Sequence, residues 1–596
     1  MPVNDMVIRI GGESGEGIVT IGEIFVRIAA FSGLEVYTFR TFPAEILGGH
    51  VIFQARIADK PVLSQGDDID VLISLNQEGY DKHIAELRPG GVVLYDSPGV
   101  KPACAECDHL LYAIPVDELA RSIDFTRGRN LVMIGAMVEL FGLPLDRAEQ
   151  MVRRRLGRHQ DVLPQNLHSL NLGYEYARDH FKQRPPVYLE PPPGEVKEGL
   201  VLTGNHALAL GAIAAGCRVY AGYPITPATD IMEFLAKELP RVGGVVVQAE
   251  DEMAAINMAI GASFAGVRAM TATSGPGLAL MIESLGLAGM TETPVVVVDV
   301  QRAGPATGMP TKTSQGDLYL AFYAGNDEFP RFVVAPSSVE DCFYQMINAF
   351  NLAERYQMPV IVLSDQALAP RVETCPPFRL DQAEIFDREV PDLNGGSDGA
   401  EYERYKFTET GVSPMAAPGT RGGRYTAEGL EHNQKGNPDY DPHNHQAMMD
   451  KRWLKVETAR KQLTLWPKVV EEWGDEDAAI TIMGWGSSLG PVQEAMARAQ
   501  TAGYKVAALF PKVLYPMPDL QIRRFIRGRR AIIIPELNQL GQFARVVEHR
   551  YSRELIRDGI EVISLNKYQG LPFRPVEIFE KIVEVAQALT ERTRVK

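Results

Sequence analysis

Two short stretches of this chain place proline-rich and acidic turns directly after neighbouring predicted strands. AGYPITPATD, residues 221–230, follows a strand predicted at 218–220, and QAEDE, residues 248–252, follows the apolar residues 244–247. Each turn leads into a predicted helix, which is the alternating pattern of α/β folds. The carboxyl ends of parallel strands meet at one edge of a sheet, where such folds bind ligands. We therefore expect the two turns to form one site.

The composition is that of an ordinary globular protein. The 596 residues carry a net charge of −16, which argues against nucleic-acid binding. No apolar stretch approaches the roughly 18 residues that a membrane span needs, and no secretory leader is recognised, so we expect a cytoplasmic protein without membrane association. Only Cys104 and Cys107 are close together, and they lack the second pair that a zinc or iron–sulfur site needs. We expect no metal on this chain.

The pattern of strands, helices and turns predicts a multidomain α/β protein. An N-terminal α/β domain covers residues 1–184, and a proline-rich linker over 185–199 is expected to act as a semi-rigid spacer. A second α/β domain covers 200–375. Residues 376–468 are rich in Gly, Pro, Asn and Asp and are expected to form an irregular connecting or covering segment, and 469–596 form a C-terminal α/β domain. Within the second domain, strands are predicted at 218–220, 244–248, 270–273, 295–300, 332–334 and 360–363.

The N-terminal domain carries two glycine-containing loops that could approach a phosphate, because glycines let backbone N–H groups come close to an anion. The candidate residues in these loops are Gly11, Gly12, Ser14, Gly15, Gly17, Glu45, Gly48 and Gly49. Glu13 and Glu16 would repel a closely bound phosphate, so a tight turn without a ligand explains the first loop equally well.

The order of the motifs resembles the 2-oxoacid:ferredoxin oxidoreductases. The motifs are GGESGEG, PAEILGG, GYPITP, EDE, TSGPG, QRAGPATGMPTKTSQGDL, GWGSS and PELNQLGQ. YPITP and RAGPATGMPT are the most selective of them, and the match covers nearly the whole chain. It is nearest to the α subunit of two-subunit members with the γ domain fused ahead of it. The resemblance implies a γ-type domain, a pyrimidine-type domain that binds thiamine diphosphate, and a transketolase C-terminal-like domain.

The resemblance implies oxidative decarboxylation of a 2-oxoacid, capture of the acyl group by coenzyme A, and transfer of two electrons to ferredoxin, reversible as CO2 fixation. We favour 2-oxoglutarate, while pyruvate, indolepyruvate and branched-chain 2-oxoacids stay open. The second carboxylate of 2-oxoglutarate would need a further cation, which Arg421, Arg424, Lys451, Arg452 or a partner subunit could supply. An alternative of another class is a non-catalytic regulatory subunit that binds an acyl-CoA or a nucleotide.

The resemblance also assigns roles to residues at the predicted sheet edge. Glu252 matches the carboxylate that stabilises the imino tautomer of the cofactor's aminopyrimidine ring, with Glu250 as the competitor, and plain helix capping remains an alternative for these acids. Arg302 would grip the substrate carboxylate in bidentate fashion, and Thr311 and Lys312 would form part of the same wall.

The cofactor loop and the coenzyme A loops are assigned in the same way. Tyr223, Pro224, Ile225 and Thr226 would line the cofactor, with Thr226 near the substrate or, alternatively, serving as a helix N-cap. The two glycine-containing loops of the N-terminal domain would bind coenzyme A. The chain departs from the family there, because Glu16 replaces the usual glutamine and Leu47 a common arginine.

Two elements of the family's machinery are missing from the sequence. It has no G-D-G and Asn motif for the magnesium diphosphate and no cysteine set for an iron–sulfur cluster. The resemblance implies that Mg²⁺ and a [4Fe–4S] cluster lie on a separate β subunit, with which this chain would share thiamine diphosphate. The implied assembly is a dimer of αβ pairs with an external ferredoxin, and the isolated chain would be inactive.

Overall fold

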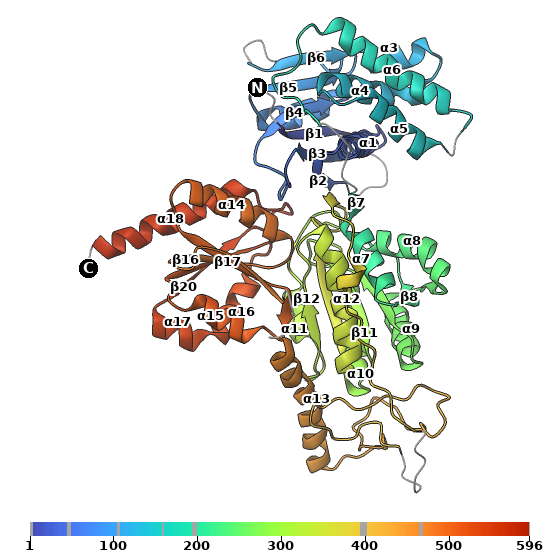
Figure 1. Ribbon diagram of the computed structural model, residues 1–596, viewed down its shortest axis with the longest axis vertical. Helices are drawn as coiled ribbons and strands as arrows, with labels where there is room; N and C mark the ends of the chain where they lie inside the picture. The colour runs from blue at the N-terminus through green and yellow to red at the C-terminus, as the bar shows by residue number, and fades with distance from the viewer. Residues whose placement is uncertain are drawn as a thin grey trace. The chain divides into compact units, whose positions relative to one another are not determined.

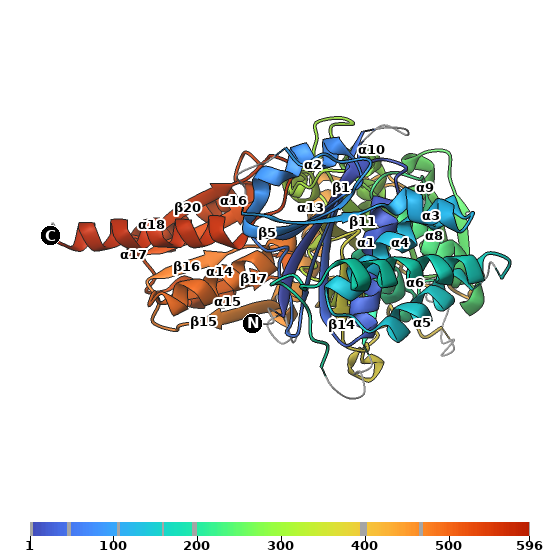
Figure 2. The same cartoon turned by 90° about the horizontal axis from the view of Figure 1, so that it is seen from above.

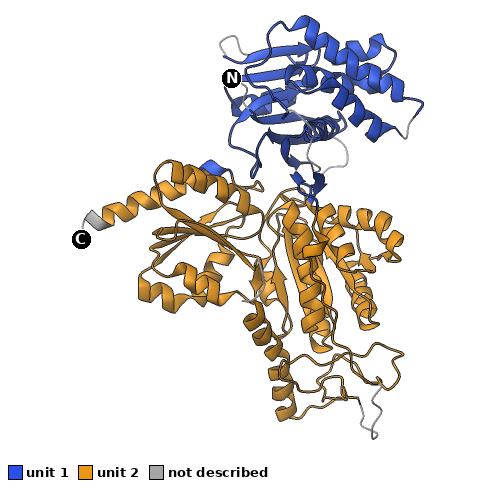
Figure 3. Ribbon diagram, in the orientation of Figure 1, with its two compact units in different colours: residues 1–203, 370–377, 574–576 blue, residues 204–369, 378–573, 577–596 orange. Residues whose placement is uncertain are grey.

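The structure, a computed structural model, describes residues 4–43, 49–103, 108–157, 160–192, 199–393, 402–463 and 469–594. Glu45, Gly48, Cys104 and Cys107 lie outside these ranges. The chain divides into two compact units, drawn in different colours in Figure 3. The first unit is Met1–Thr203 with Pro370–Pro377 and Arg574–Val576, and the second is Gly204–Ala369, Phe378–Phe573 and Glu577–Lys596.

The first unit is built on an eight-stranded mixed sheet in the order β6-β5-β4-β1-β3-β2-β14-β7. Its strands are β1 (Asp5–Glu13), β2 (Glu35–Thr41), β3 (His50–Ala58), β4 (Ile69–Ser74), β5 (Leu87–Asp96), β6 (Leu110–Ile114), β7 (Leu200–Thr203) and β14 (Val372–Cys375). Its helices are α1 (Ile18–Phe31), α2 (Gln77–His83), α3 (Val116–Ser122), α4 (Arg129–Leu140), α5 (Leu145–Leu156) and α6 (Leu163–His180). One face of the sheet packs its apolar residues against α1 and α3 to α6, and the other packs against α2.

The second unit contains a seven-stranded sheet in the order β18-β12-β13-β11-β10-β8-β9. Its strands are β8 (Val219–Gly222), β9 (Val245–Gln248), β10 (Ala269–Thr273), β11 (Val295–Gln301), β12 (Phe332–Val334), β13 (Pro359–Asp365) and β18 (Val513–Tyr515). Its helices are α7 (Gly204–Ala214), α8 (Thr229–Glu238), α9 (Glu252–Phe264), α10 (Gly275–Met290), α11 (Leu318–Tyr323) and α12 (Val339–Tyr356). All pairs are parallel except β12 with β18. The central strands are buried on both faces, which explains their continuous apolar runs.

A five-stranded sheet, β15-β17-β16-β19-β20, completes the second unit. Its strands are β15 (Val470–Gly474), β16 (Ile480–Met483), β17 (Val506–Pro511), β19 (Ala531–Glu536) and β20 (Glu561–Asn566), and its helices are α14 (Leu489–Thr501), α15 (Asp519–Ile526), α16 (Gln542–Arg550), α17 (Ser552–Asp558) and α18 (Pro575–Arg594). Helices α14 and α18 cover one face and α15 to α17 the other (Figure 1). α18 extends past the sheet to the C terminus (Figure 2). Residues of both sheets share one apolar cluster.

The predicted α/β class is confirmed. At the ends of the predicted 200–375 domain, however, β7 and β14 join the sheet of the first unit, because β14 pairs with both β2 and β7. The described part of the predicted linker, 185–192, is not a free spacer, since Val187 and Leu189 are buried in the core of the first unit. Among the helices in the described ranges, none has the length and hydrophobicity of a membrane span.

The segment predicted to be irregular contains a helix of 22 residues, α13 (Pro442–Leu463). Its buried stripe runs through Met448, Lys451, Lys455, Val456 and Ala459, with helical spacing. Lysines occupy positions in the stripe where apolar residues are expected, so the hydrophobic periodicity that predicts a helix is absent. The prediction of an irregular segment is therefore wrong for α13.

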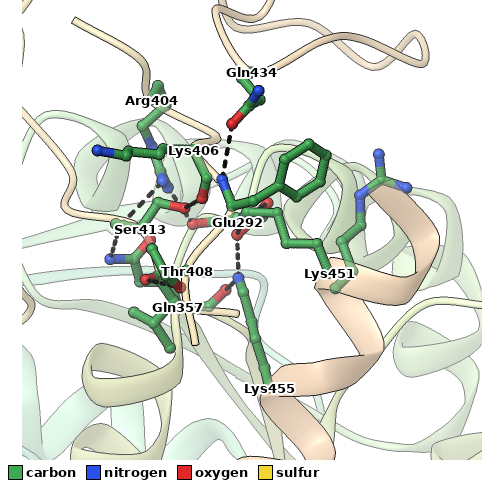
Figure 4. A network of polar contacts seen from close by, with 12 residues as sticks. Glu292, Gln357, Arg404, Lys406, Thr408, Ser413, Gln434, Lys451 and Lys455 are labelled. Carbon is green, nitrogen blue, oxygen red and sulfur yellow. Dashed lines mark hydrogen bonds and ion pairs between the residues drawn. The ribbon is translucent and has the colours of Figure 1, made fainter. Parts of the chain in front are cut away.

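The buried lysines of α13 pair with Glu292, which lies between α10 and β11 (Figure 4). Lys451 Nζ donates to both carboxylate oxygens of Glu292, at 2.7 and 2.8 Å, and Lys455 forms an ion pair with the same group. Burial alone would raise the pKa of Glu292, but these cations hold it well below its usual range. Burial lowers the pKa of Lys455 to about 7. Arg404 donates to the Glu292 carbonyl oxygen at 2.8 Å, which ties the preceding segment to the same point.

The prediction that Lys451 or Arg452 binds a distal substrate carboxylate is wrong. Both side chains are buried, and their charges are met by Glu292 and Glu431 respectively.

Replacing Glu292 with glutamine should destabilise the protein strongly, because two buried ammonium groups would lose their counter-charge. Breaking a buried pair costs about 3–5 kcal/mol, whereas an exposed pair contributes only about 0–1 kcal/mol. The matched control is Glu584→Gln, which breaks the exposed pair between Lys581 and Glu584 on α18. Denaturant and thermal unfolding should separate the two variants clearly. Equal midpoints would contradict the structural role of Glu292.

Candidate active site

Four turns that follow β8, β9, β10 and β11 form the candidate site at one edge of the seven-stranded sheet. They contain YPITP after β8, the acids before α9, the start of α10 after β10, and the long loop 302–317 after β11. The strands are parallel, so their carboxyl ends lie side by side. The sheet edge predicted from the sequence is therefore present, and the turns that follow the four strands lie together at this edge.

The three acids of QAEDE have different environments. Glu250 is exposed, whereas Glu252, the first residue of α9, is only 6% exposed. Asp251 is the N-cap, and its carboxylate accepts a hydrogen bond from the Ala254 backbone at 2.7 Å. Capping is thus the work of Asp251. The Glu252 carboxylate makes no hydrogen bond or ion pair with a described residue.

Gly277, in the first turn of α10, allows Glu252 to lie where it does. A Cβ atom at Gly277 would lie 2.6 Å from both Cγ and Oε1 of Glu252 and 2.0 Å from Thr273 Oγ1. No side chain fits in that space. The second glycine of TSGPG is therefore explained by the close approach of a buried carboxylate.

Arg302 directly follows β11 and is 7% exposed. Its Nη1 donates to the carbonyl oxygen of Thr226 at 2.7 Å, and its Nε has no hydrogen-bond partner among the described residues. Burial lowers the pKa of Arg302, while Asp317 and Glu252 act in the opposite direction. The guanidinium therefore lies within electrostatic reach of Glu252 and retains an unpaired donor.

The YPITP turn is held in place by a hydrogen bond from α7. The peptide bond between Thr226 and Pro227 is cis, and the buried Asn205 of α7 donates to the Pro227 carbonyl oxygen at 2.8 Å. Tyr223 and Thr226 are exposed, and Pro224 and Ile225 are half-buried. The alternative that Thr226 caps a helix is wrong, since α8 begins at Thr229 and its N-cap is Ala228.

The loop 302–317 is fixed by the five-stranded sheet. Gln315 accepts a hydrogen bond from the Leu537 backbone at 3.0 Å, and its own backbone N–H donates to the Leu537 carbonyl oxygen at 2.9 Å. Gln315 Nε2 also donates to the Trp485 carbonyl oxygen at 3.0 Å. Thr311 is half-buried, and its carbonyl oxygen accepts from Gln366 at 3.3 Å. The GWGSS and PELNQLGQ segments thus support the loop that carries Arg302.

In the first unit, Gly11 and Gly12 lie in β1 and not in a turn, because β1 pairs with β3 as far as Glu13. Gly15 and Gly17 have positive φ angles of 100° and 84°, so the turn proper is 14–17. The Ser14 backbone donates to the Gly49 carbonyl oxygen at 3.0 Å, which brings the two predicted loops together. Glu16 accepts hydrogen bonds within the unit from the Glu13 backbone and from Asn76.

Sequence reasoning missed two acids at the candidate site, Asp299 and Asp317. Asp299 is fully buried in β11, and neither of its carboxylate oxygens has a hydrogen-bond partner among the described residues. The signal was present, since it is a lone acid in the run VVVVDV. Asp317 precedes α11, next to the start of α10. In the described part of the chain, no group of three His, Cys, Asp or Glu side chains could hold a metal ion.

The comparisons with known proteins agree with one another. Residues 210–451 match the family model described as pyruvate flavodoxin/ferredoxin oxidoreductase, thiamine diphosphate-binding, and residues 7–176 match the model of pyruvate ferredoxin/flavodoxin oxidoreductase. The 2-oxoglutarate oxidoreductase subunit KorA of Mycobacterium tuberculosis is 34% identical over 97% of this chain and 91% of its own. The 2-oxoacid:ferredoxin oxidoreductase subunit alpha of Saccharolobus solfataricus is 33% identical over 97% of each chain.

A solved structure is similar over almost the whole chain. It is the 2-oxoglutarate:ferredoxin oxidoreductase from Magnetococcus marinus with 2-oxoglutarate, coenzyme A and succinyl-CoA bound. Its chain superposes with a TM-score of 0.90 and is 40% identical, with 98% of this chain and 99% of that chain covered.

Gly277→Ala should reduce 2-oxoacid-dependent turnover, because the added methyl group must displace Glu252 or Thr273. A misplacement of about 1 Å can cost about 10²-fold in rate. The control is Gly261→Ala in α9, where nothing lies within 4 Å of the added Cβ. Turnover by the subunit complex, measured with an artificial electron acceptor, should be kept in the control. Full activity of Gly277→Ala would show that the position of Glu252 is not critical.

Proposed function

Because the chain belongs to the 2-oxoacid:ferredoxin oxidoreductases, as an α subunit with a fused γ-type domain, we propose that it takes part in the conversion of 2-oxoglutarate to succinyl-CoA. The reaction is the CoA-dependent oxidative decarboxylation of the 2-oxoacid, with two electrons passed to ferredoxin. The reverse direction is CO2 fixation.

One observation carries this proposal: Glu252 and Arg302 come from separate turns, lie within electrostatic reach of each other, and both keep unpaired groups. Burial of a charged group without a partner is costly unless a ligand supplies the partner. A carboxylate and a guanidinium with such capacity fit the two demands of the reaction, a proton relay to the cofactor and an anchor for the substrate.

Thiamine diphosphate fits the residues at this edge. Bound there, it supplies the carbanion that attacks the substrate ketone and the electron sink after loss of CO2. Glu252 would hold a proton at the aminopyrimidine ring, with Gly277 leaving room for its carboxylate. Tyr223, Pro224, Ile225 and Thr226 would line the cofactor.

Arg302 would bind the carboxylate of the 2-oxoacid next to its ketone. The Thr226 carbonyl oxygen occupies Nη1 and orients the guanidinium, while the unpaired Nε remains a donor for an anion. Thr226 and Thr311 would contribute hydroxyl groups to the substrate wall. Water exclusion and the rest of the cofactor site would come from a partner.

Coenzyme A would bind to the first unit. The hydrogen bond between Ser14 and Gly49 supports this, since it joins the two loops predicted from the sequence. The residues assigned to it are Gly11, Gly12, Ser14, Gly15, Gly17, Glu45, Gly48 and Gly49. The partner would be a β subunit that carries Mg²⁺ and a [4Fe–4S] cluster, in a dimer of αβ pairs that serves a ferredoxin in the cytoplasm.

The preference for 2-oxoglutarate is supported by the relatives, several of which are named for it. The distal carboxylate would be met by the partner subunit or by Lys312, which belongs to the loop of Arg302 and is half-buried. Burial lowers the pKa of Lys312. Pyruvate, indolepyruvate and branched-chain 2-oxoacids are the competing substrates.

The decisive experiment measures 2-oxoacid- and CoA-dependent reduction of a low-potential dye by this chain purified with its co-expressed partner. Glu252→Gln should lose activity about 10²- to 10⁴-fold, the usual contribution of a positioned acid or base. The exposed Glu250→Gln should retain it. Loss of activity in Glu250→Gln but not in Glu252→Gln would assign the role of the cofactor's proton partner to Glu250. A wild-type complex without activity on any 2-oxoacid would favour a non-catalytic subunit that binds an acyl-CoA or a nucleotide.

Arg302→Lys should raise the KM for the 2-oxoacid about 10- to 100-fold, because hydrogen bonds to charged groups contribute about 1.5–3 kcal/mol and lysine cannot bind in bidentate fashion. Steady-state kinetics with 2-oxoglutarate measure the effect, and the KM for CoA serves as the internal control. An unchanged KM for the 2-oxoacid would remove Arg302 from the substrate site.

A further inference from the structure

The first turn of α10 separates two carboxylates. A Cβ atom at Gly275 would lie 2.7 Å from Asp317 Oδ2 and 2.9 Å from Oδ1. The glycine two residues later, Gly277, is in the same relation to Glu252. Each glycine therefore makes room for one acid, and the two acids lie along one helical turn.

Arg302 interacts electrostatically with both Asp317 and Glu252 but forms an ion pair with neither of these residues. Asp317 and Glu252 both counteract the lowering of its pKa by burial, with Asp317 the stronger of the two. Within the described ranges, the one hydrogen bond that Arg302 makes goes to the Thr226 carbonyl oxygen, and it forms no ion pair. The Arg302 guanidinium is thus attracted by two carboxylates and forms an ion pair with neither of them.

The position of Asp317 is fixed by its backbone. Its N–H donates to Gln301 Oε1 at 3.1 Å. Gln301 and Asp299 are two residues apart in β11, so their side chains point to the same face of the sheet. Asp317 therefore lies over the end of β11 on the side where Asp299 is buried.

Burial and Arg302 determine the pKa of Asp317. Burial raises the pKa of Asp317 to about 6, and Arg302 lowers it. Burial, with a contribution from Asp317, raises the pKa of Asp299 well above its usual range. Arg302, after β11, is the cation that acts on Asp317, and Glu252 on α9 acts on the same guanidinium.

We propose that Asp317 is a positioning residue for Arg302. As a second counter-charge, Asp317 prevents the Arg302 guanidinium from forming an ion pair with Glu252. The guanidinium then remains available to bind the anionic group of the substrate. The inference rests on the roles proposed above for Glu252 and Arg302.

The physical reason is competition between anions. Without Asp317, Glu252 is the carboxylate that still acts on Arg302, and we expect the buried guanidinium to move towards it. An Arg302–Glu252 ion pair would weaken substrate binding and would also occupy the carboxylate assigned to the cofactor. Asp317 thus prevents two essential groups from neutralising each other.

The test compares Asp317→Asn with wild type in the co-purified complex, with Glu328→Gln as an exposed control of equal charge change. We expect the KM for 2-oxoglutarate to rise about tenfold above pH 7, within the range of coupling between charged neighbours. Because Asp317 takes up a proton near pH 6, the KM of the wild type should approach that of the variant below this pH. A KM ratio that does not change with pH would overturn the proposal.

A double-mutant cycle with Arg302→Gln provides the second criterion. If Asp317 acts through Arg302, Asp317→Asn should add little to the KM change when Arg302 is absent. Independent, additive effects would overturn the proposal. Gly275→Ala, which keeps the acid but pushes against its carboxylate, should raise the KM in the same direction as Asp317→Asn.

Thermal unfolding gives a readout that does not depend on turnover. An acid whose pKa is raised by folding costs stability as pH increases from about 4 to about 6, because its ionised form is disfavoured in the folded protein. Asp317→Asn should remove part of this decline, and a decline as steep as in wild type would overturn the assignment.

Absence of any 2-oxoacid activity in the wild-type complex would refute the proposed function, and the inference with it, whereas failure of the inference alone leaves an active wild type.

Discussion

The parallel pairing of β8, β9, β10 and β11 is the constraint on which the site depends. Parallel strands must end at the same edge, so the turns that follow them meet even though they are far apart in the sequence. Their helices begin at this edge, and glycines in the first turn of α10 leave room for carboxylates there. Glu252 and Arg302 are consequently neighbours because of topology, although fifty residues separate them in the chain.

The five-stranded sheet has a supporting role. Gln315 exchanges hydrogen bonds with the backbone of Leu537 and reaches the carbonyl oxygen of Trp485. These bonds are buried, and a buried backbone group that lost its partner would be costly, so the loop after Arg302 has little freedom to move. The C-terminal sheet acts on the site by holding this loop through backbone groups of the GWGSS and PELNQLGQ segments.

The sequence predicted the parts of the fold that follow from apolar runs and turns. Every strand predicted between residues 218 and 363 is present, with ends that differ by a few residues. The order of those strands predicted that the YPITP and QAEDE turns share one sheet edge, whereas Glu252 and Arg302 were assigned through the family resemblance. Helix α13 was not predicted from the sequence because Lys451 and Lys455 occupy positions in its buried stripe. Asp299 could have been recognised as a lone acid in the apolar run VVVVDV, whereas Asp317 becomes informative only when its spatial neighbours are known. Register and long-range ion pairs are tertiary facts, and local patterns do not encode them.

The buried charges around Glu292 and those at the sheet edge differ in how they are compensated. Glu292 is enclosed by Lys451 and Lys455 at hydrogen-bonding distance, so its charge is satisfied within the chain and serves to fix α13. Arg302 retains an unpaired Nε, and Glu252 makes no ion pair with the described residues, although burying them costs free energy. Satisfied charges need no ligand. The unmet hydrogen-bonding capacity of Arg302 and Glu252 at the sheet edge supports the proposed site, since a bound ligand would complete it.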